Sequence, residues 1–310
     1  MKKAVVTGAN GFIGSWLIKE LVKHNVEVIA ILRNEQSDTR FLSDKVRRVY
    51  CEMSEFSKLI RLIPDRDIDV FYHLAWSRSE EQVDASGLQE INIASTMDAA
   101  VVAKQLNITK LIVPGSIGEL RVNKILDQKS MNDEERFAIA KLSAHLKIDE
   151  LCAKIGLPYV WARFCGIYGP YSDTQSNIVG YVLNELEKGN TPTVYQSNEP
   201  YDLMFIRDAA RALYLLGDEN TLESCYYVGS GEPRPLKSYL GSILQQCDDK
   251  CSIGMGFRPE ISTPYEMNWM DISMIKKDIG FTTYFSFEEG IEQTRLWPVI
   301  TKPESDTVKN

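Results

Sequence analysis

The sequence predicts an α/β protein whose core is a doubly wound parallel sheet, followed towards the C-terminus by a smaller α/β lobe. Three observations predict this fold. Short apolar runs alternate with amphipathic stretches through the first half, a glycine-rich turn joins the first run to the first stretch, and the alternation becomes irregular after Gly169 and Pro170. The 310 residues, of which 44% are hydrophobic, are enough to bury a large core.

The strands and helices of the first half are expected to alternate. Apolar runs such as Ala4–Val6 are typical of strands that are buried on both faces. In chain order the expected strands are Lys3–Thr7, Glu27–Leu32, Arg48–Cys51, Val70–Leu74, Lys110–Val113 and Tyr159–Arg163. The helices expected between them are Ser15–Lys23, Glu55–Ile63, Gln89–Gln105 and Asp133–Lys154. The expected division is a first domain of residues 1–165, with a returning segment near 202–228, and a second lobe of residues 166–201 and 229–310.

Charge and composition argue against several classes of partner. The formal net charge is −8, which disfavours nucleic acid or an anionic membrane as the main partner, because both bind basic surfaces. No apolar stretch is long enough to span a bilayer or to form a signal-peptide core, so the chain is expected to be cytoplasmic. The six cysteines and three histidines are scattered without metal-ligand spacing, and neither a metal site nor a disulfide is expected.

The turn after the first strand has the features of a phosphate-binding site. Gly8, Gly11 and Gly14 follow the expected strand and lead directly into the first helical pattern. Glycine lets the backbone approach a pyrophosphate closely, and the N–H groups and dipole of a helix N-terminus favour its negative charge. The spacing is G-x-x-G-x-x-G, for which an ordinary strand–helix turn is the alternative. The position between a buried strand and a helix favours dinucleotide binding.

The residues that follow the next three strands would line a bound dinucleotide. Leu32 stands where an NAD site usually has an acid that binds the adenosine ribose. Arg33 follows it and could pair with a 2′-phosphate, with no acid expected nearby to repel that phosphate, so we expect NADP rather than NAD; an ordinary surface arginine is the alternative. Glu52 and Met53 would flank the adenine, with a plain loop as the alternative. Leu74 and Ala75 would pass beneath the cofactor.

Two polar residues near the fourth strand are expected to be structural. His73 lies within the strand itself and is expected to be a packed core histidine rather than a catalyst. Asn92 comes early in the following helix, where a cap or a buried polar anchor is expected and a direct role remains open.

Three segments together identify a family. Thr7–Gly14 reads Thr-Gly-Ala-Asn-Gly-Phe-Ile-Gly, the fifth strand ends in Val113-Pro114-Gly115-Ser116, and a later helix carries Phe137-Ala138-Ile139-Ala140-Lys141. They resemble the extended short-chain dehydrogenase/reductases, the NAD-dependent epimerase/dehydratase family that acts on nucleotide sugars. Further segments are similar to family landmarks in the family's order: Arg163–Pro170, Thr193–Asp208, Tyr227–Glu232 and Phe257–Pro259. The resemblance implies a Rossmann-like sheet with a nucleotide-sugar-binding lobe, and the expected cofactor contacts are Gly8, Asn10, Gly11, Phe12, Ile13, Gly14, Arg33, Glu52, Met53, Leu74, Ala75 and Lys141.

The resemblance also implies a catalytic set from which one member is missing. The family uses a serine or threonine together with Y-x-x-x-K, and positions four apart share one face of a helix. The lysine favours the phenolate that exchanges a proton with the sugar oxygen. Ser116 and Lys141 match this pattern, but Phe137 stands where the tyrosine belongs. Three interpretations remain: an engineered inactive variant, which we favour; natural drift to a catalytically silent dinucleotide-binding protein; or a proton from another group such as Tyr168.

The residues after Ser116 bear on the type of reaction. Dehydratases of the family place an acid soon after the catalytic hydroxyl, whereas Glu119 here comes one place too late. This counts against a dehydratase. Because Arg33 favours NADP, we expect an NADPH-dependent reductase of a 4-keto nucleotide-linked deoxysugar. An epimerase of the same family is the alternative.

The family's substrate contacts can be carried over only in part. Ser116 is expected to bind the sugar oxygen, Asn177 to bind a phosphate, and Arg258 to bind the diphosphate. Tyr201 and Gly166 stand where many members have an arginine and an asparagine, which indicates an unusual substrate. Many relatives dimerise through two long helices per subunit, so a homodimer is expected by analogy.

Overall fold

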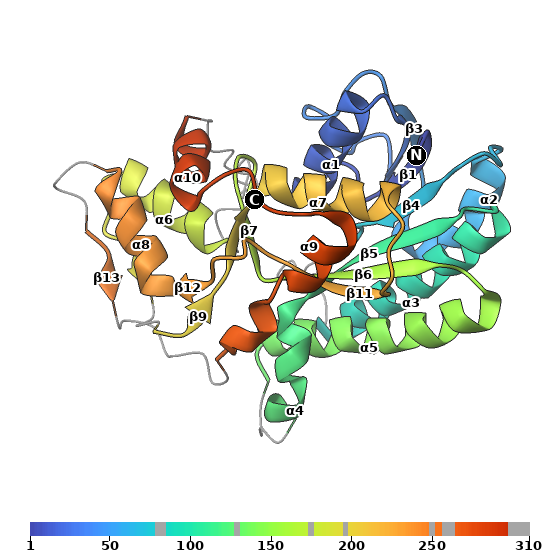
Figure 1. The fold of residues 1–310 in the computed structure, drawn as a ribbon. Coiled ribbons are helices and arrows are strands. Elements are labelled where there is room, and N and C mark those ends of the chain that lie inside the picture. Colours follow the sequence, from blue (N-terminus) through green and yellow to red (C-terminus); the bar gives the residue numbers. More distant parts are fainter. Residues whose placement is uncertain are drawn as a thin grey trace, which may run out of the picture.

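The computed structural model describes residues 1–77, 85–126, 131–172, 177–194, 198–247, 252–255 and 264–296. In this part of the chain, seven parallel strands form the central sheet (Figure 1). Their order is β11-β6-β5-β4-β1-β2-β3, with β1 (Lys3–Thr7), β2 (Glu27–Leu32), β3 (Arg47–Tyr50), β4 (Val70–His73), β5 (Lys110–Ser116), β6 (Tyr159–Phe164) and β11 (Cys225–Val228). The predicted doubly wound parallel sheet is confirmed. All seven carboxyl ends lie at one edge, where such sheets bind their ligands.

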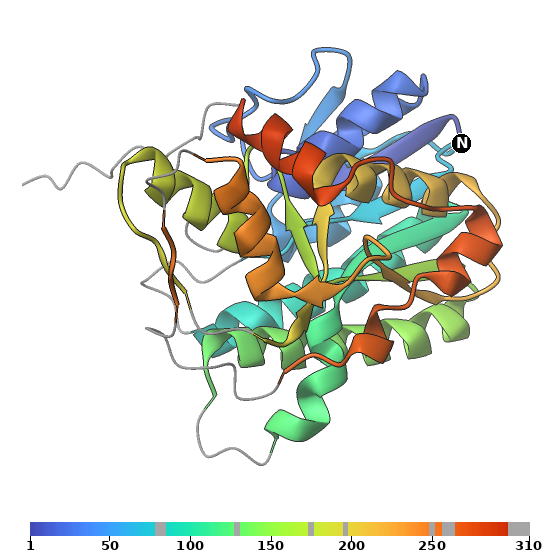
Figure 2. The same ribbon diagram turned by 60° about the vertical axis from the view of Figure 1, so that its left-hand side comes forward.

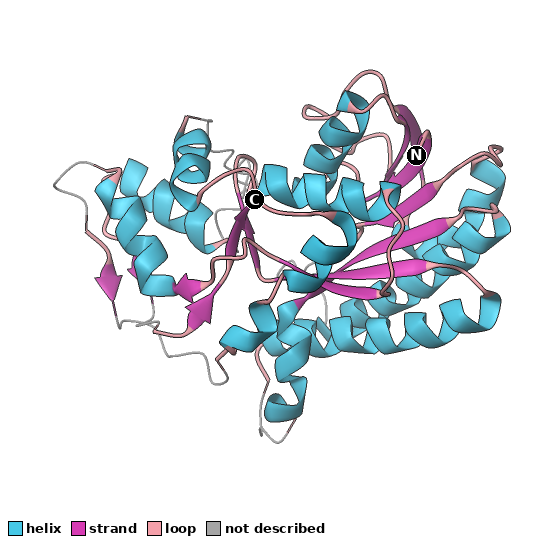
Figure 3. Cartoon of the chain, in the orientation of Figure 1, coloured by secondary structure: helices cyan, strands magenta, loops and turns pink. Residues whose placement is uncertain are grey.

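Helices cover both faces of this sheet, because alternate residues of a strand point to opposite faces. Val6 packs in the same cluster as α1 (Phe12–Lys23) and α7 (Ile206–Asp218). Its neighbour Val5 packs with α3 and α5 on the other face. Figure 3 shows the two helix layers with the strands between them. The bounds of the second pair are α3 (Ala85–Gln105) and α5 (Asp133–Ile155).

Most elements lie close to their predicted bounds, and the differences have local causes. β5 continues three residues beyond its predicted end, because it stays paired with β6 as far as Ser116 opposite Phe164. The helix predicted before β4 is a 3₁₀ helix, η1 (Met53–Lys58), followed by the single turn α2 (Leu59–Leu62), and the backbone kinks at Glu55. β11 lies within the segment that was expected to return to the sheet.

A smaller lobe lies beyond the carboxyl edge, where β6 leads into β7 (Figures 1 and 2). Its strand pairs are β7 (Gly166–Tyr168) with β10 (Leu203–Phe205), β9 (Pro200–Tyr201) with β12 (Arg234–Pro235), and β8 (Thr193–Val194) with β13 (Gly254–Met255). Its helices are α6 (Ile178–Glu187), α8 (Leu236–Gln245) and α10 (Phe287–Arg295). Four further short helices follow β5 and β13: η2 (Ile117–Arg121) and α4 (Val122–Ile125) lie between β5 and α5, and η3 (Met267–Met270) and α9 (Ser273–Ile279) lie between β13 and α10.

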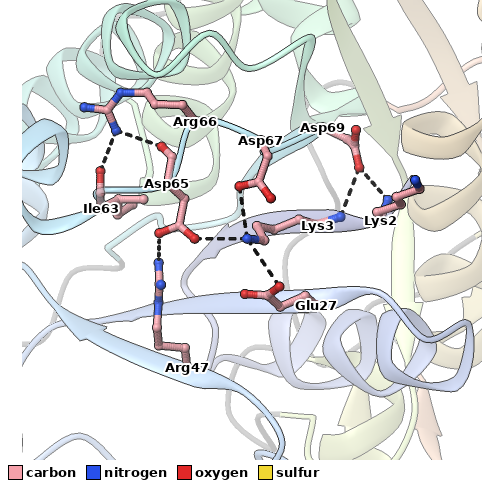
Figure 4. A network of polar contacts seen from close by, with 9 residues as sticks. All are labelled: Lys2, Lys3, Glu27, Arg47, Ile63, Asp65, Arg66, Asp67 and Asp69. Carbon is pink, nitrogen blue, oxygen red and sulfur yellow. Dashed lines mark hydrogen bonds and ion pairs between the residues drawn. The ribbon is translucent and has the colours of Figure 1, made fainter.

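An ion-pair network fastens the opposite edge of the sheet, at the amino ends of the strands (Figure 4). Lys3 Nζ lies 3.0 Å from a carboxylate oxygen of Asp65 and of Asp67, and 3.3 Å from Glu27. Arg47 at the start of β3 contacts Asp65 as well. The hydrogen bond to Asp65 raises the pKa of Lys3, and the hydrogen bond from Arg47 lowers the pKa of Asp65 to about 2. The network joins β1, β2 and β3 at the edge remote from the glycine turn.

The described ranges contain no helix that is long and apolar enough to cross a membrane. In the same ranges no three His, Cys, Asp or Glu side chains are grouped so that they could hold a metal ion. Five cysteines are free thiols, and the sixth, Cys251, lies outside the described residues.

Candidate functional site

The predicted glycine turn lies at the carboxyl edge and packs closely against the end of β4. Gly8 has φ +62°, a conformation that favours glycine, and a Cβ there would lie 2.8 Å from the Ala75 nitrogen. A Cβ at Gly14 would lie 2.2 Å from the Gly8 carbonyl oxygen. The Gly11 N–H donates to that same oxygen at 3.0 Å. The first turn of α1 therefore sits directly against the strand ends.

The start of α1 fits a pyrophosphate. Gly11 is the N-cap residue and has no side chain that could bond the first N–H groups, and the first turn contains no acid. The positive end of the helix dipole thus meets neither a competing charge nor a side-chain cap. Asn10 comes just before the N-cap, and Phe12 and Ile13 are the first two residues of α1. These residues fit the dinucleotide that the sequence predicts, and the individual contacts stay predictions.

His73 is a core histidine, as predicted, and it joins the ends of β1 and β4. Thr7 Oγ1 lies 3.0 Å from His73 Nδ1 and accepts the N–H groups of Leu74 and Ala75 at 3.1 and 3.2 Å. His73 Nε2 lies 3.2 Å from the hydroxyl of Thr96 on α3. Burial lowers the pKa of His73 to about 3, so the ring is neutral at physiological pH. Leu74 and Ala75 are thereby held beside the glycine turn, where the prediction puts the cofactor.

Asn92 is a buried anchor, which was the structural role expected for it. Its Oδ1 accepts the Ser77 N–H at 2.8 Å, and its Nδ2 donates to the Ser77 carbonyl at 2.9 Å. These two bonds tie the segment after β4 to α3. They also fix the position of Trp76, the residue just before Ser77.

Arg33 lies at the end of β2, as predicted, but the prediction that it faces no acid is wrong. Its Nε lies 4.0 Å from a carboxylate oxygen of Glu52, which follows β3. Both side chains are well exposed, at 68% and 49%. The two strands are neighbours in the sheet, so residues that are distant in the sequence meet at this edge. A 2′-phosphate at Arg33 would also meet the charge of Glu52. Met53 begins η1 directly after it.

Ser116 ends β5 and caps the helix that follows. The Gly118 N–H donates to Ser116 Oγ at 3.1 Å, and the Ser116 N–H donates to the Glu119 carboxylate at 2.7 Å. This reciprocal pair is a capping box. The bond from Gly118 uses one Oγ lone pair of Ser116 and leaves its O–H proton for donation to a ligand.

Glu119 is the centre of a buried polar network that the sequence does not reveal. Its carboxylate accepts the Trp161 indole N–H at 2.9 Å and Arg163 Nε at 2.9 Å, and lies 3.3 Å from His145 Nδ1. The His145 ring stacks on Trp161, with ring centres 4.7 Å apart. Burial opposes the charge, but the contacts from His145 and Arg163 outweigh it and lower the pKa of Glu119. An ionised Glu119 therefore anchors the backbone of Ser116.

Lys141 reaches the same strand end from α5. Its Nζ donates to the Pro114 carbonyl oxygen at 2.8 Å, two residues before Ser116. The same nitrogen lies 3.6 Å from the centre of the Trp76 ring, a cation–π contact. Phe137, one turn earlier on α5, meets Trp76 edge to face, with ring centres 5.9 Å apart. Sequence reasoning missed Trp76, whose only signal was its place three residues after His73, at the strand end.

The substrate residues predicted in the second lobe are less clearly placed. Asn177 caps α6: its Oδ1 accepts the N–H groups of Val179 and Gly180, both at 3.1 Å, and its Nδ2 donates to a backbone carbonyl. Its phosphate contact stays a prediction. Arg258 lies outside the described residues.

Tyr168 does not reach the site as a substitute proton source. Its side chain is fully buried, and its hydroxyl donates to the Phe287 carbonyl at 3.0 Å. Burial also raises the pKa of this phenol. The alternative in which Tyr168 replaces the missing hydroxyl is therefore wrong.

Comparison with known proteins identifies a matching family and agrees with the fold. A family model described as "NAD dependent epimerase/dehydratase family" matches residues 4–229. The dTDP-glucose 4,6-dehydratase of Neisseria meningitidis is 22% identical, over 100% of this chain and 97% of that protein. The dTDP-6-deoxy-L-talose 4-dehydrogenase (NAD(+)) of Aggregatibacter actinomycetemcomitans is 25% identical, over 78% and 89%. The solved UDP-N-acetylglucosamine 4-epimerase of Methanobrevibacter ruminantium, in complex with UDP-N-acetylmuramic acid, is similar with a TM-score of 0.76, 22% identity, and coverage of 96% and 97%.

Proposed function

The chain belongs to the NAD-dependent epimerase/dehydratase family, and from this premise we propose that it transfers hydride between NADP(H) and C4 of a nucleotide-linked sugar. The direction we propose is reduction of a 4-keto sugar. The observation that carries the proposal is the bond from Lys141 Nζ to the Pro114 carbonyl, which brings a helix lysine to the strand end that bears Ser116. A glycine turn that fits a pyrophosphate lies at the same edge. The talose dehydrogenase named above supports a 4-keto reaction by its name.

Each residue of the site has a distinct task in this mechanism. When bound, the nicotinamide supplies or accepts the hydride. Ser116 donates its O–H to the sugar oxygen, while one of its two Oγ lone pairs accepts the Gly118 N–H. Lys141 contributes positive charge beside that oxygen and binds the nicotinamide ribose. Phe137 has no proton to exchange, and loss of a positioned acid–base group typically costs about 10²–10⁴-fold in rate. Slow turnover by the chain as it stands follows from this.

Restoring the hydroxyl tests the proposal directly. Phe137→Tyr should raise the rate of NADPH oxidation with a 4-keto nucleotide sugar by about 10²-fold or more, because it returns an acid to the helix face that carries Lys141. The matched control is Phe137→Tyr combined with Lys141→Met, which should lose the gain. A silent dinucleotide-binding protein predicts no gain in the single variant although the coenzyme binds. That result would remove the proposed catalytic function.

The proposed coenzyme is NADP, with NAD as the alternative. The exposed guanidinium of Arg33 supports a contact with a 2′-phosphate. Glu52 beside it and the NAD(+) in the name of the talose dehydrogenase favour NAD. Titration with both coenzymes separates them: Arg33→Ala should weaken NADP⁺ binding far more than NAD⁺ binding, and Glu52→Gln should strengthen NADP⁺ binding. Equal affinities in all three proteins would refute a role for Arg33.

An NAD-dependent epimerase is the second candidate. An epimerase keeps its coenzyme, usually NAD, through the cycle. Glu52 beside Arg33 favours NAD, and the solved epimerase above favours this type of reaction. Incubating the Phe137→Tyr variant with UDP-glucose and NAD⁺ distinguishes the reactions. Formation of a C4-epimer without net change in NADH absorbance favours the epimerase, whereas net formation of NADH, by oxidation of the C4 hydroxyl, favours the reductase running in reverse.

We also propose a homodimer that is formed by α3 and α5. The two helices pack side by side (Figure 1), and they expose apolar side chains such as Ile91, at 42%, and Leu146, at 63%. Light scattering coupled to gel filtration should give twice the chain mass, and Leu146→Glu should give the monomer. A monomer at all concentrations would refute this arrangement.

A further inference from the structure

The indole N–H of Trp76 is a buried donor at the wall of the candidate site. Its Nε1 is inaccessible to solvent, and no residue that the structure describes accepts a hydrogen bond from it. Two other indoles behave differently: Trp161 donates to Glu119 at 2.9 Å, and Trp16 donates to the Pro170 carbonyl at 3.1 Å. A buried N–H without an acceptor is costly and uncommon, so its presence calls for a physical cause.

The Trp76 ring is packed between two side chains of α5 and the segment that follows β4. Lys141 Nζ lies 3.6 Å from the centre of the ring, and the ring of Phe137 packs against it at 5.9 Å. Asn92 holds the next residue, Ser77, by two hydrogen bonds. Trp76 thus lies between the residues that carry the chemistry and the segment that follows β4.

We infer that Trp76 binds ligand: its indole N–H donates a hydrogen bond to a sugar hydroxyl oxygen that binds beside Phe137 and Lys141 and displaces the atoms that cover the nitrogen in the ligand-free chain. The inference rests on the proposed function and adds a contact to it. An indole N–H can only donate, so it selects an acceptor oxygen, and the nearby ammonium of Lys141 favours the same kind of atom. At position 137 the phenyl ring offers no donor of its own, and Trp76 supplies one next to it.

Two parts of the expected ligands carry such an oxygen, the nicotinamide ribose of the coenzyme and the hexose of the nucleotide sugar. The experiment separates them. The indole N–H of each of the five tryptophans gives one cross-peak in a ¹⁵N–¹H spectrum, and Trp76→Phe identifies the peak of Trp76 by its loss. NADP⁺ and UDP-glucose are then added to the original chain separately, and each addition is followed in the same spectrum.

The Trp76 peak should move downfield in ¹H on addition of the ligand whose oxygen it binds, while the peak of Trp161 stays in place because its N–H is already bonded. Trp76→Phe should raise the Kd of that ligand about tenfold, as expected for one lost hydrogen bond, and leave the Kd of the other unchanged. Trp16→Phe is the matched control, since it removes an indole N–H bonded to the protein backbone. It should change neither affinity.

Two results overturn the inference while the proposed function stands. In the first, both ligands bind, as their thermal shifts report, but the Trp76 peak does not move and Trp76→Phe binds both equally. In the second, the peak of the ligand-free protein already exchanges magnetisation with water, which assigns the N–H to a structural water. If neither ligand binds the original chain, the proposed function fails first and the inference falls with it.

Discussion

Replacing Glu119 by glutamine should destabilise the protein strongly, because the charge of this carboxylate balances a buried cluster of donors. Glu119→Gln keeps the length of the side chain and one acceptor oxygen for the Ser116 N–H. It turns the second oxygen, which accepts Arg163 Nε at 2.9 Å, into an N–H₂ group, whereas the Trp161 N–H keeps its 2.9 Å bond to the first oxygen. The substitution therefore leaves the Arg163 guanidinium facing another donor and without its counter-charge.

The magnitude follows from the burial of the pair. The Glu119 side chain is 0% exposed and that of Arg163 is 19% exposed. Removing one partner of a buried ion pair costs about 3–5 kcal/mol. Because Arg163 retains some contact with solvent, we expect the lower end, a loss of about 3 kcal/mol in the free energy of unfolding at pH 7. The lowered pKa of Glu119 also makes this stabilisation depend on pH. The contribution of Glu119 to the free energy of unfolding is present above the ordinary titration range of glutamate and is lost as the pH falls through its lowered pKa.

Urea unfolding, followed by tryptophan fluorescence from pH 7 to pH 3, measures both effects. Glu289→Gln is the matched control, since Ser286 and Glu289 form the same capping box on an exposed helix. That variant should lose much less stability. A Glu119→Gln variant that is no less stable than Glu289→Gln, or whose difference from the original chain does not shrink on acidification, would refute the role of Glu119 as an ion-paired anchor.

Two further predictions concern the two edges of the sheet. Gly14→Ala should abolish the thermal shift given by NADP⁺ or NAD⁺, because its Cβ would lie 2.2 Å from the Gly8 carbonyl oxygen. The control, Gly241→Ala, places a Cβ in open space and should keep the shift. A shift that is retained in both variants would contradict the close packing of the turn. Asp65→Asn should cost about 1 kcal/mol at pH 7, the scale of a partly exposed ion pair. Because the pKa of Asp65 is lowered from 3.8 to about 2, this difference should vanish as the pH falls through that interval, which acid unfolding monitored by circular dichroism will reveal.

The sequence predicts what is local and periodic, and less of what depends on packing. Buried apolar runs and the glycine turn locate the parallel sheet and its ligand edge, because those signals lie within a few consecutive residues. The partners of Glu119 are not close to it in the sequence. Trp161 and Arg163 are 42 and 44 residues away, and nothing in either segment indicates the other. The same limit explains Arg33, whose neighbour Glu52 arrives from an adjacent strand.

The contacts that hold the candidate catalytic residues explain why a single missing oxygen need not disturb the site. Ser116 is fixed through its backbone by Glu119, and Lys141 is fixed by the Pro114 carbonyl and the face of Trp76. None of these bonds uses an atom that phenylalanine lacks and tyrosine has. Phe137 contributes only its ring, which packs edge to face on Trp76. A hydroxyl added at position 137 would therefore enter a site whose geometry is set independently of it, so its effect should appear in the rate of proton transfer rather than in the free energy of unfolding.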